Sequence, residues 1–195
     1  MTDGDLVQLV AFRTRLPADQ FTSAWRPIAS GFLDAGLGTI TLASFDDAED
    51  GTAFLSRNTW PADAYRRAFP GGLAADGAAG PVSVRQAGVF APLDGGGRPV
   101  AEARPDLELS LALVRVPDAH DRPAVVAAAL AAVPGGDAVA YLGAASGQRY
   151  DVALTVHGAR GTGASAAAAL RSALAAFAGV DHSVVLSGRE LLSLT

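Results

Sequence analysis

The chain has 195 residues, of which 50% are hydrophobic and 18% are charged, enough for one large domain or two small ones with a sizeable core. All 15 basic residues are arginine, and 20 acidic residues bring the formal net charge to −5. No basic stripe interleaves with aromatic residues, which argues against a nucleic-acid partner. There is no cysteine, which excludes disulfides, thiolate metal sites and a cysteine nucleophile.

The N-terminal residues MTDGDLVQLVAF are acidic and lack the basic start of a signal peptide. No apolar run reaches the roughly 18 residues that a membrane span needs. We therefore expect a soluble, cytoplasmic protein with no membrane partner.

The first half predicts the element order βαββαβ. Residues 6–15 are apolar on both alternating faces, which is typical of a strand covered on both sides. An amphipathic helix is expected over 16–36, with Pro27 as a kink or break. Its apolar positions are Phe21, Trp25, Ile28, Phe32 and Leu33. The remaining elements are strands at 37–45 and 52–60 joined by the acidic turn DDAEDG, a short helix at 61–69 and a strand at 82–90.

The second half repeats that order after a stretch rich in glycine, proline and charge, residues 91–106. The expected strands are 107–116, 137–145, 150–157 and 184–194, and the expected helices are 121–133 and 165–178. We therefore predict a first unit at 1–91, a linker at 92–106 and a second unit at 107–195.

Each unit has the ferredoxin-like, split βαβ pattern. Two helices cover only one face of a four-stranded sheet, yet the strands are apolar on both faces. The sequence therefore predicts an α+β protein in which two tandem ferredoxin-like units pack sheet to sheet within one chain, as a barrel with a cavity.

The stretch SRNTWPADAYRRAF, residues 56–69, concentrates aromatic and polar side chains. With VAFRTRLPADQFTSAW and GLGTITLASF it resembles the antibiotic biosynthesis monooxygenase-like family of the dimeric α+β barrel superfamily, over roughly residues 6–90. Some members of that family oxidise phenolic polyketides with O₂ and no cofactor. The resemblance implies an enzyme of secondary metabolism that acts on a phenolic or polycyclic polyketide-type molecule.

The resemblance carries over Asn58 and Trp60 directly, and Tyr65 more weakly. Asn58 would hydrogen-bond a substrate carbonyl or enolate oxygen, and Trp60 would stack on an aromatic ring. Strand alternation places Phe54 and Ser56 on the same face as these two residues.

Three further polar side chains are candidates for the same site. Arg13 or Arg85, on neighbouring strands, could stabilise a phenolate. His157 closes the equivalent strand of the second half and is the candidate general base. The positions that match Asn58 and Trp60 in that half are about Val156 and Gly158, so the second unit looks degenerate at the site.

Structural alternatives stand beside each of these roles. Trp60 is a candidate core residue, Asn58 a helix cap, Tyr65 part of a solvated helix face and His157 a surface residue. The alternative activities are a non-redox cyclase, isomerase or lyase, and the alternative class is a non-catalytic ligand-binding or structural protein.

We expect no cofactor and no metal. The helix at 61–69 lacks the histidine of the haem-degrading relatives, and no histidine pair has ligand spacing. GTGASA, residues 161–166, resembles a phosphate-binding loop but is interpreted as a loop and helix start. A chain with two fused units is expected to be a monomer or a weak homodimer.

Overall fold

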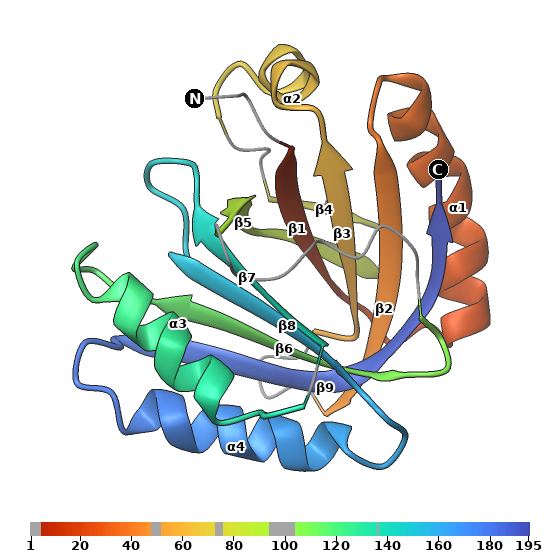
Figure 1. Ribbon diagram of the computed structural model, residues 1–195. Coiled ribbons are helices and arrows are strands. Elements are labelled where there is room, and N and C mark those ends of the chain that lie inside the picture. Colours follow the sequence, from red (N-terminus) through yellow and green to blue (C-terminus); the bar gives the residue numbers. More distant parts are fainter. Residues whose placement is uncertain (1–4, 48–51, 73–75, 94–103, 136) are drawn as a thin grey trace.

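The computed structural model describes residues 5–47, 52–72, 76–93, 104–135 and 137–195 (Figure 1). The elements in chain order are β1 (Leu6–Arg13), α1 (Ala18–Asp34), β2 (Thr39–Asp47), β3 (Phe54–Trp60), α2 (Ala62–Ala68), β4 (Gly77–Ala79), β5 (Val82–Pro92), β6 (Glu108–Arg115), α3 (Arg122–Ala131), β7 (Asp137–Gly143), β8 (Val152–Gly158), α4 (Gly163–Ala175) and β9 (His182–Leu194).

Eight of these strands close into one antiparallel barrel. The order is β1-β3-β2-β9-β6-β8-β7-β5, and β5 pairs with β1 to complete the ring. The short β4 lies outside the ring as a hairpin partner of β5. The predicted α+β barrel is confirmed.

Both halves of the chain use the same strand order. It is β5-β1-β3-β2 in the first half and β9-β6-β8-β7 in the second, which is the ferredoxin-like arrangement. The halves are joined at two seams, where β9 pairs with β2 and β7 pairs with β5. These pairings cover the outer edges of both four-stranded sheets, so the barrel exposes no long strand edge there.

Three apolar clusters account for strands that are apolar on both faces. One cluster is built almost entirely from strand residues and fills the barrel, with Leu9, Phe90 and Leu111 almost fully buried. The other two lie between the sheet and the helices, one around Trp25 and Trp60 and the other around Leu170 and neighbouring residues. In Figure 1, α1 and α2 cover the first half and α3 and α4 cover the second.

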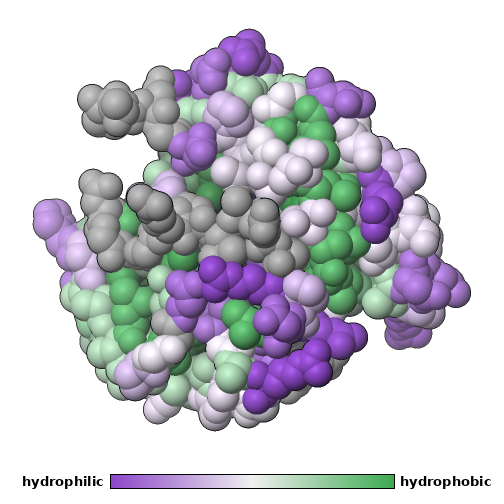
Figure 2. Space-filling model, turned by 45° about the vertical axis from the view of Figure 1, so that its right-hand side comes forward, coloured by the Kyte–Doolittle hydropathy of each residue, from purple (hydrophilic) through white to green (hydrophobic). Residues whose placement is uncertain are grey.

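The helix α1 differs from its prediction in which face it buries. Pro27 lies inside a continuous helix and does not split it. The buried row is Phe21, Trp25 and Ala29, spaced four residues apart, while Ile28 is 60% exposed. An i, i+4, i+8 row follows one helix face, whereas the predicted i+7 position lies about 60° away from it. The side of the molecule that carries α1 comes forward in Figure 2, and apolar residues are visible on its surface.

Most element boundaries differ from the predictions by one to three residues, and one strand was not predicted. β5 continues to Pro92, beyond the predicted strand end and into the predicted linker. β4 is missed because three small residues carry no periodic signal. Residues 48–51 of the acidic turn and 94–103 of the linker lie outside the described residues. The division into units 1–91 and 107–195 stays a prediction. No described helix is both long and apolar enough to cross a membrane.

Gly188 lies at the point where β9 passes from β6 to β2. It faces Leu109 of β6 on one side and Phe45 of β2 on the other. A Cβ at this position would lie 1.9 Å from the carbonyl oxygen of Ser44. Only glycine therefore allows β9 to approach β2 closely enough to form this seam.

We expect Gly188→Ala to lower the free energy of unfolding by about 2 kcal/mol or more, because the added methyl group would meet backbone that cannot move aside cheaply. The control is Gly31→Ala, where a Cβ meets nothing within 4 Å and a helix position gains propensity. Urea denaturation of both variants measures the difference. Equal stability of Gly188→Ala and the wild type would show that the seam tolerates a wider spacing.

Candidate functional site

The aromatic residues of the 56–69 stretch form a packed cluster between the sheet and the helices. The Trp60 ring is fully buried and meets Tyr65 and Phe69 edge-on at 5.9 and 5.7 Å between ring centroids. Phe32 of α1 contacts the same ring at 6.3 Å. Trp60 is thus a core residue in this structure, with an aromatic environment already supplied by the chain itself.

Tyr65 and Phe54 also serve this layer. The Tyr65 hydroxyl donates to the Gly72 carbonyl at 2.6 Å, and burial raises the pKa of Tyr65 to about 12. The Phe54 ring stacks on Phe21 of α1 at 4.2 Å. The interpretation of Tyr65 as part of a solvated helix face is therefore wrong, because the ring is 3% exposed.

Asn58 takes part in a chain of buried amides on the same face. Gln8 Oε1 accepts from Asn58 Nδ2 at 3.2 Å and from Trp60 Nε1 at 3.1 Å, while Gln8 Nε2 donates to Gln86 at 3.0 Å. No side chain caps α2, so Asn58 is not its N-cap. The Asn58 Oδ1 atom is buried and has no hydrogen-bond partner among the described residues.

The opposite face of β3 carries a buried charge. Arg57 follows Leu55 of the interior cluster at the strand period, so its side chain enters the barrel. An Arg57 guanidinium nitrogen lies 3.1 Å from Glu190 Oε1 on β9. The side chains of Arg57 and Glu190 are 6% and 2% exposed, so this ion pair is almost fully withdrawn from water.

His157 joins this ion pair from the second half. Its Nε2 lies 3.2 Å from Glu190 Oε1, and its side chain has no exposed surface. The interpretation of His157 as a surface residue is therefore wrong. Its side chain faces the inside of the barrel, because it continues the face of Thr155 and Ala153 on β8.

The carboxylate of Glu190 is held by three groups. Besides Arg57 and His157, the backbone N–H of Arg104 donates to Glu190 Oε2 at 2.7 Å. Burial acts to raise the pKa of Glu190, but the nearby His157 ring and the charge of Arg57 outweigh it and hold the pKa below its ordinary value. Glu190 is therefore a carboxylate at neutral pH.

This geometry fixes what the histidine can do. An ionised Glu190 accepts only, so we assign the His157 proton to Nε2, which faces the carboxylate. Nδ1 then carries a lone pair. Neither ring nitrogen makes a hydrogen bond with a described residue, so the 3.2 Å approach of Nε2 to Glu190 is an electrostatic contact. A carboxylate behind an imidazole stabilises the imidazolium that forms when the histidine takes a proton. We define Arg57, Glu190 and His157 as the interior charge cluster.

Two hydroxyl groups adjoin the interior charge cluster. Tyr141 on β7 is fully buried, and burial raises its pKa against the opposing effect of the Arg57 charge. Thr155 on β8 pairs with Val139 on β7, and its side chain is 2% exposed. Four strands, β3, β7, β8 and β9, thus bring titratable or polar groups to one place.

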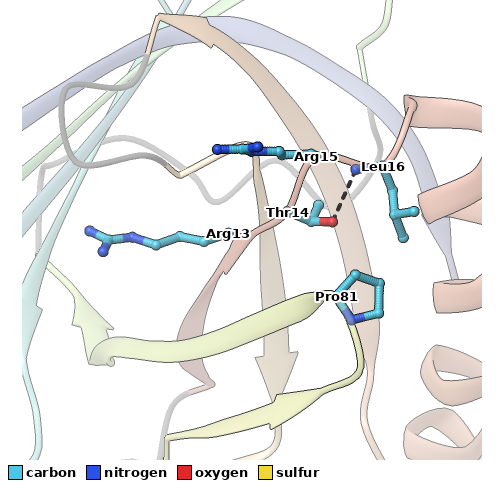
Figure 3. Close-up of a pocket in the computed structure, with 5 residues that line it drawn as sticks. All are labelled: Arg13, Thr14, Arg15, Leu16 and Pro81. Carbon is cyan, nitrogen blue, oxygen red and sulfur yellow. Dashed lines mark hydrogen bonds between the residues drawn. The ribbon is translucent and has the colours of Figure 1, made fainter.

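Arg13 lines a pocket at the end of the barrel, apart from Asn58 and Trp60. The pocket has a volume of about 480 Å³ and is lined by Arg13, Thr14, Arg15, Leu16 and Pro81 (Figure 3). Arg85 lies opposite Ala11 in the β1–β5 register, on the same strand face as Arg13. The two predicted arginines are thus brought together.

Asn58, Trp60 and His157 line neither this pocket nor the one of about 540 Å³ beside α4 in the described part of the chain. The barrel interior is filled by the side chains of the apolar cluster. The structure therefore shows two separate features where the sequence predicted one open cavity. One is an apolar, packed barrel that contains the interior charge cluster, and the other is a set of surface pockets.

The glycine-rich loop at 161–166 binds a carboxylate of the chain itself. Glu108 Oε1 accepts the Gly161 N–H at 2.8 Å, and Oε2 accepts that of Gly163. These two hydrogen bonds, the one from Gly161 foremost, lower the pKa of Glu108. The N-terminus of α4 is thereby occupied, as the interpretation of a loop and helix start expects.

The sequence interpretation missed Arg57 and Glu190 as a pair. It attached no role to Arg57. Arg57 and Glu190 both stand within predicted strands, but polar residues beside them in each strand keep the pattern from marking either position as inward. Which strands meet across the barrel is not visible in the pattern. Among the described residues, no group of three acidic or histidine side chains could hold a metal ion.

Comparisons with known proteins locate the fold but not a family. No protein-family model and no curated protein sequence matches the chain. An anthrone oxidase-like protein of known structure aligns over 99% of this chain and 94% of its own, with a TM-score of 0.56 and 14% identity. A Fusobacterium nucleatum protein described as a monooxygenase aligns over 99% and 95%, with a TM-score of 0.57 and 10% identity.

Chlorite dismutase from Candidatus Nitrospira defluvii, solved in complex with imidazole, aligns over 96% of this chain and 92% of its own, with a TM-score of 0.54 and 10% identity. At such identities the likeness shows the fold alone. The chain is an α+β barrel protein whose two halves have ferredoxin-like strand order.

We expect Trp60→Ala to lower the free energy of unfolding by about 3–5 kcal/mol, because the fully buried ring leaves a cavity in the aromatic cluster. Phe32→Ala is the matched control, since its ring contacts Trp60 but is 39% exposed, and its loss should be clearly smaller. Thermal and urea denaturation measure both. A loss below about 1 kcal/mol for Trp60→Ala would mean that the ring lines open space.

We expect the stability of the wild type to fall more steeply on acidification than that of Glu190→Gln. The folded-state pKa of Glu190 lies below the unfolded value of about 4.3. The stability that ionised Glu190 contributes is therefore fully present above the unfolded-state pKa. It is lost as the pH falls through the folded-state pKa. Urea denaturation between neutral pH and about pH 3 measures both slopes, with Asp34→Asn as control. Parallel curves for the wild type and Glu190→Gln would contradict the assignment.

Proposed function

We propose that the protein is a monooxygenase-like enzyme that acts without a cofactor on a phenolic or polycyclic, polyketide-type molecule, with the interior charge cluster as its reaction centre. The observation that carries this proposal is the buried His157–Glu190 pair beside Arg57. The solved structures named above support the choice of reaction class only through their shared fold.

The chemistry assigns a role to each member of the cluster. His157 Nδ1 takes a proton from an acidic CH₂ group beside a phenol or ketone, and Glu190 stabilises the imidazolium. Arg57 places a fixed positive charge where the oxyanion develops. The carbanion gives one electron to O₂, the two radicals combine at carbon, and the hydroperoxide loses water. The balance is CH₂ + O₂ → C=O + H₂O, so no external reductant is needed.

The barrel interior suits this chemistry because it excludes water, but its packing limits the entry of a substrate. A site without water protects a carbanion from reprotonation. The apolar side chains that fill the interior must however move aside to admit a ring system. Asn58, Trp60 and Tyr65 then act from the helix side of β3, holding the strand that carries Arg57.

The same packed interior favours a second candidate, a non-catalytic structural or ligand-binding protein. In that case the interior charge cluster ties β3, β8 and β9 together and has no substrate. A non-redox cyclase, isomerase or lyase would use the same histidine as a base and would need no O₂. The three functions differ in what they consume, so one experiment separates them.

We expect the wild type to consume O₂ with anthrone as substrate and to form the ketone product, measured with an oxygen electrode and by absorbance. His157→Gln should lower the rate by about 10²–10⁴-fold, the usual contribution of a general base. His120→Gln is the control, because its side chain is 97% exposed. Circular dichroism and thermal denaturation establish that both variants fold.

Each outcome assigns one function. Product formation that proceeds equally without O₂ would replace the monooxygenase by a non-redox enzyme. No turnover of anthrone or related hydroxylated anthrones would leave the structural or binding protein. Full activity of His157→Gln would remove the interior charge cluster from the mechanism.

A further inference from the structure

A second pocket lies on the outside of the barrel, between α4 and β9, with a volume of about 540 Å³. Ser187 and Arg189 alternate with the inward Leu186 and Glu190 along β9, so both stand on the outer, helix-covered face. The sheet therefore separates this pocket from the interior charge cluster. Figure 1 shows α4 running along this side of the barrel.

Three of the seven residues that line the pocket have little or no side chain. On α4 it is lined by Ala164 and Ala167. On β9 it is lined by Gly188, where a Cβ would meet the carbonyl oxygen of Ser44 at 1.9 Å. The β2–β9 seam thus requires a position without a side chain at the edge of the pocket.

Two guanidinium groups line the same pocket. Arg171 donates from one terminal nitrogen to the Val185 carbonyl at 3.1 Å, while its Nε is buried without a hydrogen-bond partner among the described residues. Arg189 is exposed and makes no ion pair with any residue that the structure describes. A buried N–H without a partner is costly, and a ligand oxygen would relieve that cost.

The one acidic residue of the lining is already engaged. Glu108 accepts the backbone N–H groups of Gly161 and Gly163 at the start of α4. These donors lower the pKa of Glu108 and keep it ionised, opposite Arg189 in the β6–β9 register. The two arginines of the lining therefore exceed its one carboxylate by a single positive charge. Ser187 adds a hydroxyl group, and Ala164 adds exposed apolar surface.

We propose that this pocket binds an amphipathic organic anion, a small molecule with a carboxylate or sulfonate on an apolar ring system. Arg171 and Arg189 bind the anionic group, because a planar guanidinium matches its oxygen atoms. The ring system lies against the exposed Ala164. The volume falls within the usual range for small-molecule sites. This binding is independent of the reaction proposed for the barrel interior.

The test is a fluorescence titration with 8-anilinonaphthalene-1-sulfonate, which combines a sulfonate with an apolar ring body. We expect saturable binding at one site. Arg189→Gln should weaken it about tenfold, and Arg171→Gln by a similar factor or more. Arg26→Gln on the exposed surface of α1 is the matched control and should leave the dissociation constant unchanged.

Two further titrations separate the effect of the ligand's charge on affinity from the effect of the pocket's shape. Ala164→Leu should weaken binding by occupying the pocket, at an exposed helix position that tolerates leucine. N-phenyl-1-naphthylamine, the probe's neutral counterpart, should bind the wild type more weakly than the sulfonate.

The proposal is overturned by any of three results. One is an absence of saturable binding up to millimolar probe, and another is equal affinity for the neutral and the anionic probe. The third is an Arg189→Gln variant that binds like Arg26→Gln. Arg189 is exposed, so this variant keeps the test decisive even if Arg171→Gln fails to fold.

Discussion

The structure depends on the pairing of strand edges between the two halves of the chain. A four-stranded sheet with two helices on one face leaves its other face and both of its edges in need of partners. The chain meets both needs at once, because the pairings of β2 with β9 and of β7 with β5 close the ring and bury the second faces inside it. The fold of either half therefore depends on the other.

The interior charge cluster depends on the same closure. Burying a charge is costly unless it is paired and hydrogen-bonded, and Glu190 comes from the strand that forms one seam. Arg57 and His157 come from different halves and meet only because the ring is closed. A buried ion pair is weak evidence for stability, since an apolar replacement often serves as well.

Much of the fold was predictable from sequence patterns, because alternation and helical periodicity are local. Strands that are apolar on both faces, such as β1 and β6, required a second covering layer, and the barrel supplies it. Ile28 was misassigned because the periodicity of α1 permits two neighbouring apolar rows, and only packing against the sheet selects the row of Ala29.

The site was less predictable than the fold. Asn58 and Trp60 were singled out by resemblance, and the structure places them in a hydrogen-bonded layer outside the barrel. Arg57 and Glu190 are far apart in sequence, and the register that joins them involves a shift in the β2–β9 ladder between Leu42 and Ala43. Such irregularities leave no mark in a hydrophobic pattern. The pairing could therefore not be derived from the sequence.

The β2–β9 seam also has a consequence for the order of events during synthesis. β2 ends at Asp47, whereas its partner strand begins only at His182. Most of the described chain is made while one edge of the first sheet still has unpaired backbone groups. An open edge of this kind is a template for pairing with other chains, and distant pairings form slowly. The nascent chain is therefore most exposed to aggregation before β9 emerges, and the closed ring ends that exposure in one step.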